Sequence, residues 1–130
     1  VLGAEGVQIG TRFALTEESS ASSVFKDYCL SLREGDTKLL LKKLAPTRLV
    51  KNAFREAVEK AEDSGASAED LRTLLGRGRA KKGIFEGDLE EGELEIGQVS
   101  AIISRRQSVA EVMNELVAAY QRAAKKDYLF

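Results

Sequence analysis

The sequence predicts an α/β fold in which most of the residues are helical. One short run of strand-forming residues, from Gly6 to Gly10, is bounded by glycines near the beginning of the chain. From about Ser20 onward, apolar residues instead recur with the spacing of helices. The 130 residues are 43% hydrophobic and 32% charged, which suffices for one folded domain with an apolar core.

The run from Gly6 to Gly10 is expected to be a buried strand that carries Val7 and Ile9 and ends in a turn. A buried strand needs hydrogen-bonded neighbours, because each unpaired backbone group costs about 1–3 kcal/mol. The sequence offers no obvious neighbours. Either the run is not a strand, or these residues are the C-terminal piece of a larger α/β protein. Residues 1–4 lack an initiator Met and are expected to be a cut rather than a natural beginning.

The remaining chain is expected to be helical, apart from a strand at Thr37–Leu41. Pro46 favours an extended Ala45 and a new helix that begins just after it. A shorter piece is expected at about Ile96–Ile103. Apolar stripes at helical spacing predict the other helices, which cover Val24–Leu32, Leu49–Ala61 and Val109–Tyr120, with a further one from Ser67 to Leu75.

Two sequence signals mark where helices begin. Ser67 precedes Asp70 by three residues, and Ser108 precedes Glu111 by the same spacing. This spacing is typical of a capping box, in which the two side chains bond each other's backbone N–H groups. Cys29 and the two tyrosines on apolar stripes, Tyr28 and Tyr120, are expected in the core.

Composition excludes several classes of function. The chain has no His and a single Cys, so neither a zinc site of the usual ligands nor a His-activated nucleophile is expected. No catalytic residue and no metal ligand is assigned. No apolar run approaches the ~20 residues that a bilayer span needs, so we expect a soluble, cytoplasmic protein. A net charge of −1 argues against binding to nucleic acid.

The candidate functional segment is Gln8, Ile9, Gly10 and Thr11, at the end of the predicted strand. A Gly there lets the backbone approach a ligand, and the surrounding N–H groups together with a Thr hydroxyl can converge on a phosphate. An ordinary turn has the same composition, and the spacing alone favours that alternative.

Two blocks of the sequence resemble one protein family. The first runs from Leu2 to Phe13 and continues into Thr16–Ser19, and the second runs from Glu86 to Ile103. The first block resembles the final strand and exit loop of the FMN-dependent enoyl-acyl-carrier-protein reductase and nitronate monooxygenase family. The second block resembles the acidic-Gly stretch and the Gly-Gln element in the C-terminal part of the same family. The resemblance covers nearly the whole chain and is weakest between about Leu39 and Arg79.

The resemblance implies a fold and a cofactor. The family fold is a (β/α)8 TIM barrel that binds FMN at the carboxyl ends of its strands. The chain would then supply the C-terminal piece, with the last barrel strand and flavin-phosphate loop in residues 1–19. A mainly helical extension would occupy residues 20–130. The positions matching Gln8, Ile9, Gly10 and Thr11 wrap the flavin phosphate in the family.

The resemblance also implies an activity for a longer parent protein. We expect an FMN-dependent oxidoreductase of fatty-acid synthesis that passes hydride from NAD(P)H through FMN to a trans-2-enoyl thioester carried by acyl carrier protein. The parent is expected to be a homodimer. The family's catalytic histidine and its phosphate-binding glycines on the seventh strand lie in the remainder of the barrel, so these residues alone are not expected to be active.

Two alternatives stay open: a nitronate monooxygenase of the same family, and a stand-alone helical interaction domain. Gly97 and Gln98 are a candidate active-site rim by the same resemblance, although a packing or solvent-facing Gln fits as well. Arg48 could reach a phosphate or carboxylate, but the sequence supplies no partner for it. A basic cluster could dock an acidic partner or form a solvated helix face, and consists of Arg72, Arg77, Arg79, Lys81 and Lys82.

Overall fold

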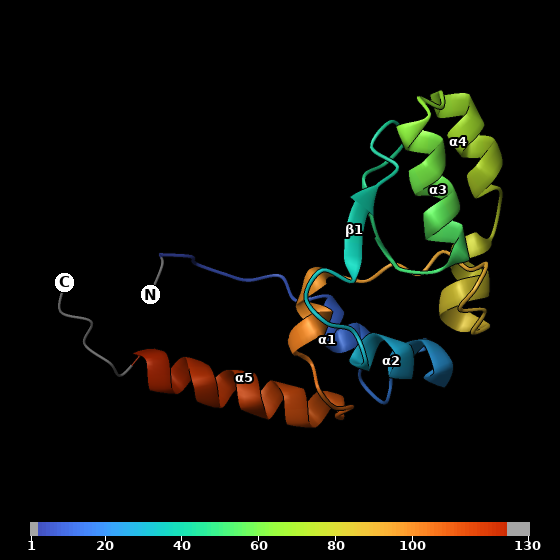
Figure 1. Ribbon diagram of the computed structural model, residues 1–130. Coiled ribbons are helices and arrows are strands. Elements are labelled where there is room, and N and C mark those ends of the chain that lie inside the picture. The colour runs from blue at the N-terminus through green and yellow to red at the C-terminus, as the bar shows by residue number, and fades with distance from the viewer. Residues whose placement is uncertain (1–2, 125–130) are drawn as a thin grey trace.

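The computed structural model describes residues 3–124, which form helices around a small sheet (Figure 1). Helices α3 and α4 form one lobe with the sheet, helices α1 and α2 lie in a second lobe with η2, and helix α5 projects from that lobe. The elements in chain order are α1 (Thr11–Ala14), α2 (Ser23–Leu30), β1 (Thr37–Leu40), β2 (Thr47–Val50), α3 (Ala53–Asp63), α4 (Ala68–Leu75), the π-helical turn η1 (Lys81–Phe85), the 3-10 helix η2 (Gln98–Ile102) and α5 (Val109–Ala124).

The two strands pair antiparallel, with Thr37 opposite Val50 and Leu40 opposite Thr47. A third segment adds to the free edge of β2, where Glu95 forms an isolated bridge with Leu49. The N–H of Val50 donates to the carbonyl of Leu94 at 2.9 Å. The chain around Glu95 is thereby fixed to the sheet, just before the predicted rim residues at 97 and 98.

The core has two parts, and β2 separates them. Leu49 packs with Phe54, Val58 and Leu71 between the sheet and helices α3 and α4. Its neighbour Val50 packs into the second part, because successive residues of a strand point to opposite faces. That second part contains Leu15, Phe25, Cys29, Leu32, Leu94, Ile96 and Ile103.

Side chains cap the helices where the sequence predicts it. The Ser67 hydroxyl accepts from the N–H of Asp70 at 3.2 Å, and the Asp70 carboxylate accepts from the N–H of Ser67 at 2.8 Å. Ser108 and Glu111 make the same reciprocal pair, which confirms the second capping box. The strand predicted at Thr37–Leu41 and the buried state of Cys29 are also confirmed.

The helix predicted just after Pro46 is wrong in its first part. Leu49 and Val50 belong to strand β2, and the helix begins only at Ala53. Both residues are fully buried, and β-branched and aliphatic residues fit a strand buried on both faces as well as a helical stripe. The Asn52 side chain accepts from the N–H of Arg55 at 2.8 Å and so fixes the start of α3.

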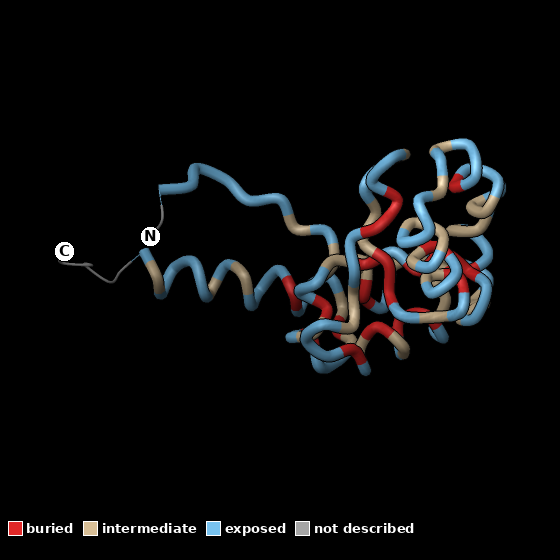
Figure 2. The backbone as a smooth tube through the Cα atoms, turned by 45° about the horizontal axis from the view of Figure 1, so that its top comes forward, coloured by how far each residue is buried: buried red, intermediate tan, exposed pale blue. Residues whose placement is uncertain are grey.

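The strand predicted over Gly6–Gly10 is absent from the described part of the chain. Residues 3–10 run as an extended, largely exposed segment that leaves the body of the molecule (Figure 2). Within residues 3–124 no other segment pairs with it, so the hydrogen bonds that would define a strand are missing. The extended backbone is as expected, whereas its burial in a sheet is not observed.

The apolar stripe of the last helix is exposed rather than buried. Val112 is buried, but Met113 and Val117 are about half exposed and Tyr120 is 74% exposed, so the prediction of a core Tyr120 is wrong. Tyr28, by contrast, is partly buried and its hydroxyl donates to the carbonyl of Lys51 at 2.6 Å. Among the described helices, none combines the length and apolar character that a bilayer span requires.

Candidate functional site

The four residues predicted to bind a phosphate occupy the passage from the extended segment into helix α1. Gln8 and Ile9 lie in the extended segment, Gly10 precedes the helix, and Thr11 is its first residue. The carbonyl of Gly10 accepts from the N–H groups of Phe13 and Ala14 at 3.0 and 2.9 Å. These bonds turn the chain sharply at the predicted loop.

Thr11 joins this loop to the second predicted block. Its hydroxyl oxygen accepts from the N–H of Gly97 at 3.0 Å, although the two residues lie 86 positions apart. A Cβ on Gly97 would overlap the Thr11 hydroxyl, so the contact requires a glycine at this position. The structure therefore brings together Thr11 and the predicted rim residue Gly97.

The surroundings of Gly10 suit an anion. A side chain at Gly10 would meet no atom within 4 Å, so the space beside it is open. Among residues 3–124, the N–H groups of Gly10, Thr11 and Arg12 donate to no backbone carbonyl outside helix α1. The loop thus offers unpaired amide donors and open space, which are what a phosphate site requires.

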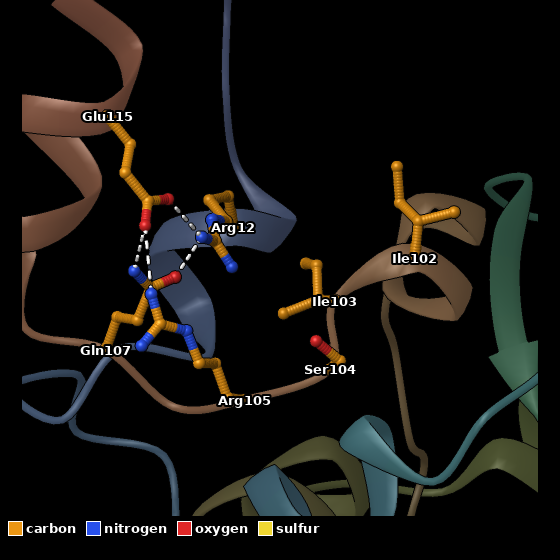
Figure 3. A pocket seen from close by; sticks show the side chains of 7 residues that line it. All are labelled: Arg12, Ile102, Ile103, Ser104, Arg105, Gln107 and Glu115. Atoms are coloured by element: carbon orange, nitrogen blue, oxygen red, sulfur yellow. Dashed lines mark hydrogen bonds and ion pairs between the residues drawn. The ribbon is translucent and has the colours of Figure 1, made fainter. Parts of the chain in front are cut away.

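A cluster of polar side chains holds helix α1 against helix α5 (Figure 3). The Arg12 guanidinium donates to the Gln107 side-chain oxygen and to the Glu115 carboxylate, the latter at 3.0 Å. Gln107 is 3% exposed and donates in turn to Glu115 at 2.5 Å. Hydrogen bonds from Gln107 and Arg12 keep the pKa of the Glu115 carboxyl below its usual value. The residue after Thr11 is therefore anchored from two sides.

Arg12 and Gln107 were not predicted as site residues. Arg12 follows the predicted loop directly, and this position was the one signal that could have singled it out. Gln107 and Glu115 lie about a hundred residues further along the chain. No pattern of spacing connects residues that are so far apart, so only the fold reveals the cluster.

Gln98 lines a separate cavity of about 650 Å³, which contains no residue of the predicted loop. Arg48 contributes to this cavity and also to a smaller one, of about 390 Å³, which contains Thr11 and Gly97. Arg48 therefore lines both the cavity with Gln98 and the cavity with Thr11 and Gly97. The smaller cavity also contains Glu95.

The basic cluster is partly used inside the fold. Arg79 donates to the carbonyls of Leu75 and Glu91 at 2.9 and 2.7 Å, and its guanidinium stacks on the Phe54 ring. Lys82 pairs with Asp88 at 2.9 Å. Arg79 and Lys82 are thus bonded within the fold, so these two residues do not simply form the solvated helix face expected for the cluster. Within residues 3–124, no group of carboxylates and cysteine is placed to hold a metal ion.

Sequence comparisons identify relatives of the chain. The family model of nitronate monooxygenase matches residues 1–119. A probable nitronate monooxygenase of Bacillus subtilis (strain 168) is 32% identical over 116 residues, which are 88% of this chain and 33% of that protein. A probable nitronate monooxygenase of Staphylococcus aureus (strain JH9) is 42% identical over 65 residues, 48% of this chain and 18% of that protein. The chain thus spans at most about a third of the length of these curated relatives.

Solved structures show the same relationship in three dimensions. FabK from Thermotoga maritima superposes with a TM-score of 0.78 and 28% identity, over 95% of this chain and 39% of that chain. Its M276A mutant gives a TM-score of 0.76 at 24% identity, over 95% and 36% of the two chains. Both are TIM-barrel proteins, so the arrangement of helices and small sheet described above is similar to a part of such a protein.

Proposed function

This chain belongs to the nitronate monooxygenase family, and we propose that it forms the last barrel strand, the FMN-phosphate loop and the helical region of a longer flavin-dependent oxidoreductase. Residues 1–19 would hold the strand and loop, and residues 20–130 the helical region. The observation that carries the proposal is the hydrogen bond between Thr11 and Gly97. It unites the two distant blocks that resemble the family, beside an open loop of unpaired amides.

The loop would bind the flavin phosphate through Gly10 and Thr11, with Gln8 and Ile9 leading into it. The N–H groups around Gly10 would donate to the phosphate oxygens, and the Thr11 hydroxyl, which already accepts from Gly97, keeps its proton free to donate. The hydrogen bonds from Arg12 to Gln107 and Glu115 would hold these donors in place. FMN, when bound, supplies the transfer of hydride that no protein side chain can perform.

The reaction we propose is the reduction of a trans-2-enoyl thioester of acyl carrier protein, with NAD(P)H as the hydride donor. It is supported by the resemblance of the Glu86–Gln98 stretch to the reductase branch of the family. The chain contains no His, so the group that protonates the substrate would come from the remainder of the protein, as would the rest of the flavin site. The whole enzyme would be a homodimer.

Oxidation of a nitronate by O₂ is the second candidate. The name of the matching family and the names of both curated relatives favour it. The consumption of NAD(P)H or of O₂ distinguishes the two reactions. The reductase would consume NAD(P)H with an enoyl thioester in the absence of oxygen, whereas the monooxygenase would consume O₂ with a nitronate and without a nicotinamide.

Replacing Gly10 by Val in the whole protein tests the loop. The Val side chain would fill the open space beside Gly10, so we expect the purified variant to lose most of its FMN. Flavin absorbance per protein measures this directly. Because a side chain at Gly10 meets no protein atom within 4 Å, the thermal stability of the 130-residue chain itself should hardly change.

Ala110→Val serves as the control, since Ala110 is an exposed residue of helix α5 and lies outside the loop. It should retain more FMN than Gly10→Val. Full flavin content in Gly10→Val would show that the phosphate is held elsewhere. A colourless whole protein that takes up no FMN would contradict the flavoenzyme itself and favour a stand-alone helical interaction domain.

A further inference from the structure

The largest of the cavities described above, of about 650 Å³, carries two arginines without a carboxylate partner. It lies between the loop after α2, which contributes Arg33, strand β2, which contributes Arg48, and the 3-10 helix η2. Among residues 3–124, neither guanidinium forms an ion pair with Asp or Glu. The one carboxylate that lines the cavity is Glu34, so the lining side chains carry more positive than negative charge.

Hydrogen bonds to strand β1 fix the side chain of Arg48. One nitrogen of the Arg48 guanidinium donates to the Thr37 hydroxyl at 3.2 Å and to the Thr37 carbonyl at 3.4 Å. Both acceptors lie on the neighbouring strand β1, so Arg48 is fixed by the sheet. Its other nitrogens make no hydrogen bond to the described residues and remain available for a ligand.

The second arginine, Arg33, begins a tight turn and lines the same cavity. The N–H of Arg33 donates to the Asp36 carboxylate at 2.7 Å, which closes the turn over residues 33–36. The Asp36 carboxylate thus accepts from the backbone N–H of Arg33. The Arg33 residue is exposed, and its guanidinium makes no hydrogen bond or ion pair with residues 3–124. A planar guanidinium is suited to paired hydrogen bonds with phosphate oxygens.

The cavity is also lined by exposed aliphatic residues. Val99 is 50% exposed and Ile102 is 84% exposed, and both lie on η2 beside Gln98. A cavity of this size that is lined by both cations and aliphatic groups fits a ligand that joins an anion to an extended, less polar arm. Free phosphate alone would leave the aliphatic groups unused.

We propose that Arg33 and Arg48 bind the phosphate or pyrophosphate group of a reactant that approaches the flavin through this cavity. The inference rests on the proposed function for the identity of the reactant. Two reactants carry the required chemistry: the nicotinamide dinucleotide with its pyrophosphate, and an acyl thioester of phosphopantetheine. Arg48 also lines the cavity that contains Thr11 and Gly97, so the anion site adjoins the flavin-phosphate loop.

The first measurement is the binding of inorganic pyrophosphate to the whole protein by calorimetry. Arg33→Gln and Arg48→Gln are each expected to weaken it by about 10- to 100-fold, because each removes charge-assisted hydrogen bonds. Arg48→Lys should bind pyrophosphate better than Arg48→Gln but more weakly than the wild type, since it keeps the positive charge and loses the planar guanidinium that can form paired hydrogen bonds. Arg77→Gln is the matched control, because Arg77 is exposed and lies outside the cavity.

The second measurement identifies the reactant from Michaelis constants. NADH is compared with 1-benzyl-1,4-dihydronicotinamide, which donates hydride but has no phosphate. Crotonyl-coenzyme A is compared with crotonyl-N-acetylcysteamine, which has the thioester but no phosphate. A KM that rises at least about 10-fold in Arg48→Gln for the phosphate-bearing member of one pair alone supports the site and names its ligand.

The outcomes separate the anion site from the proposed function. Unchanged pyrophosphate affinity in both Gln variants, in a protein that holds FMN, overturns the site and leaves the flavoenzyme standing. A protein without FMN whose pyrophosphate binding disappears in both Gln variants supports the site and contradicts the flavoenzyme. Arg33 is exposed, so its variant gives a clear result even where Arg48→Gln lowers the melting temperature.

Discussion

At the scale of single residues, Glu93 has the most unusual ionisation among the described carboxyl groups. Its residue exposure is 8%, and burial, followed by the charge of Glu95 and a hydrogen bond with it, raises the pKa of Glu93 to about 7. Arg79 opposes the shift without cancelling it. A carboxyl group with a raised pKa destabilises the fold once it ionises, because the unfolded chain solvates that charge better.

We predict that the chain becomes less stable as the pH rises from about 4.5 to about 7. In this window the folded chain keeps a proton on Glu93 that the unfolded chain has released, so the free energy of unfolding falls with increasing pH. Glu93→Gln should remove this dependence and stabilise the chain at pH 7.5 by on the order of 2 kcal/mol. Urea denaturation at pH 5.5 and 7.5 measures both effects.

Glu5→Gln provides the control for that experiment, because Glu5 lies exposed in the extended segment. Its unfolding free energy should follow the wild type at both pH values. If the wild type were equally stable at pH 5.5 and 7.5, or if Glu93→Gln kept the full dependence, the Glu93 carboxyl would not be responsible. Carboxyl groups with lowered pKa, such as Glu111, act in the opposite direction and at lower pH.

At the scale of elements, local signals predicted the helices well and pairing poorly. The caps at Ser67 and Ser108 depend on residues three positions apart, which the sequence displays directly. Strand β2 needed knowledge of its partner β1 and of the segment at Leu94, since an apolar run of this kind also fits a helix. Its second partner, the segment at Leu94, lies far along the chain, so periodicity alone could not decide between strand and helix.

Helix α5 shows a second limit of periodicity. The pattern predicts an apolar face, but it does not say what covers that face. In the structure Val112 packs inside, whereas Met113, Val117 and Tyr120 remain 45–74% exposed. The cluster of Arg12, Gln107 and Glu115 fixes the first turns of the helix, and the later turns project from the body (Figure 2).

We predict that adjacent residues of α5 respond very differently to truncation in the 130-residue chain. Val112→Ala should lower the free energy of unfolding by about 2 kcal/mol, because it leaves a cavity at a fully buried position. Met113→Ala should change it by less than about 0.5 kcal/mol, because that side chain is 45% exposed. Chemical denaturation of the two variants side by side provides the measurement, and equal losses would mean that the exposed face is covered in solution.

At the scale of the whole molecule, the resemblance supported the family, whereas the contacts between distant segments could not be predicted from it. The structure joins Thr11 of the predicted loop to Gly97 of the predicted rim, a contact that the sequence does not indicate, and places Gln98 in a separate cavity with Arg33 and Arg48. The hydrogen bonds of Arg48 with Thr37 could not be predicted, because Thr37 lies opposite Val50 and reaches Arg48 only diagonally across the sheet. The predicted strand at residues 6–10 depends on contacts that the described residues do not supply.

The proposed barrel therefore makes a prediction about residues 4–9. In the 130-residue chain these amides have no backbone acceptor among residues 3–124, so their hydrogens should exchange with solvent within seconds. In the whole flavoenzyme the same amides would pair with neighbouring barrel strands, and we expect exchange to slow by at least about 100-fold, as it does for other paired strand amides. Hydrogen-exchange mass spectrometry of the N-terminal peptide compares the 130-residue chain with the whole flavoenzyme.

The amide of Val50, which is bonded to the carbonyl of Leu94 at 2.9 Å, should be protected in both proteins and so serves as the reference for slow exchange. Rapid exchange of residues 4–9 in a whole protein that holds FMN would show that this segment is not a barrel strand, because a buried strand cannot leave its backbone groups unpaired.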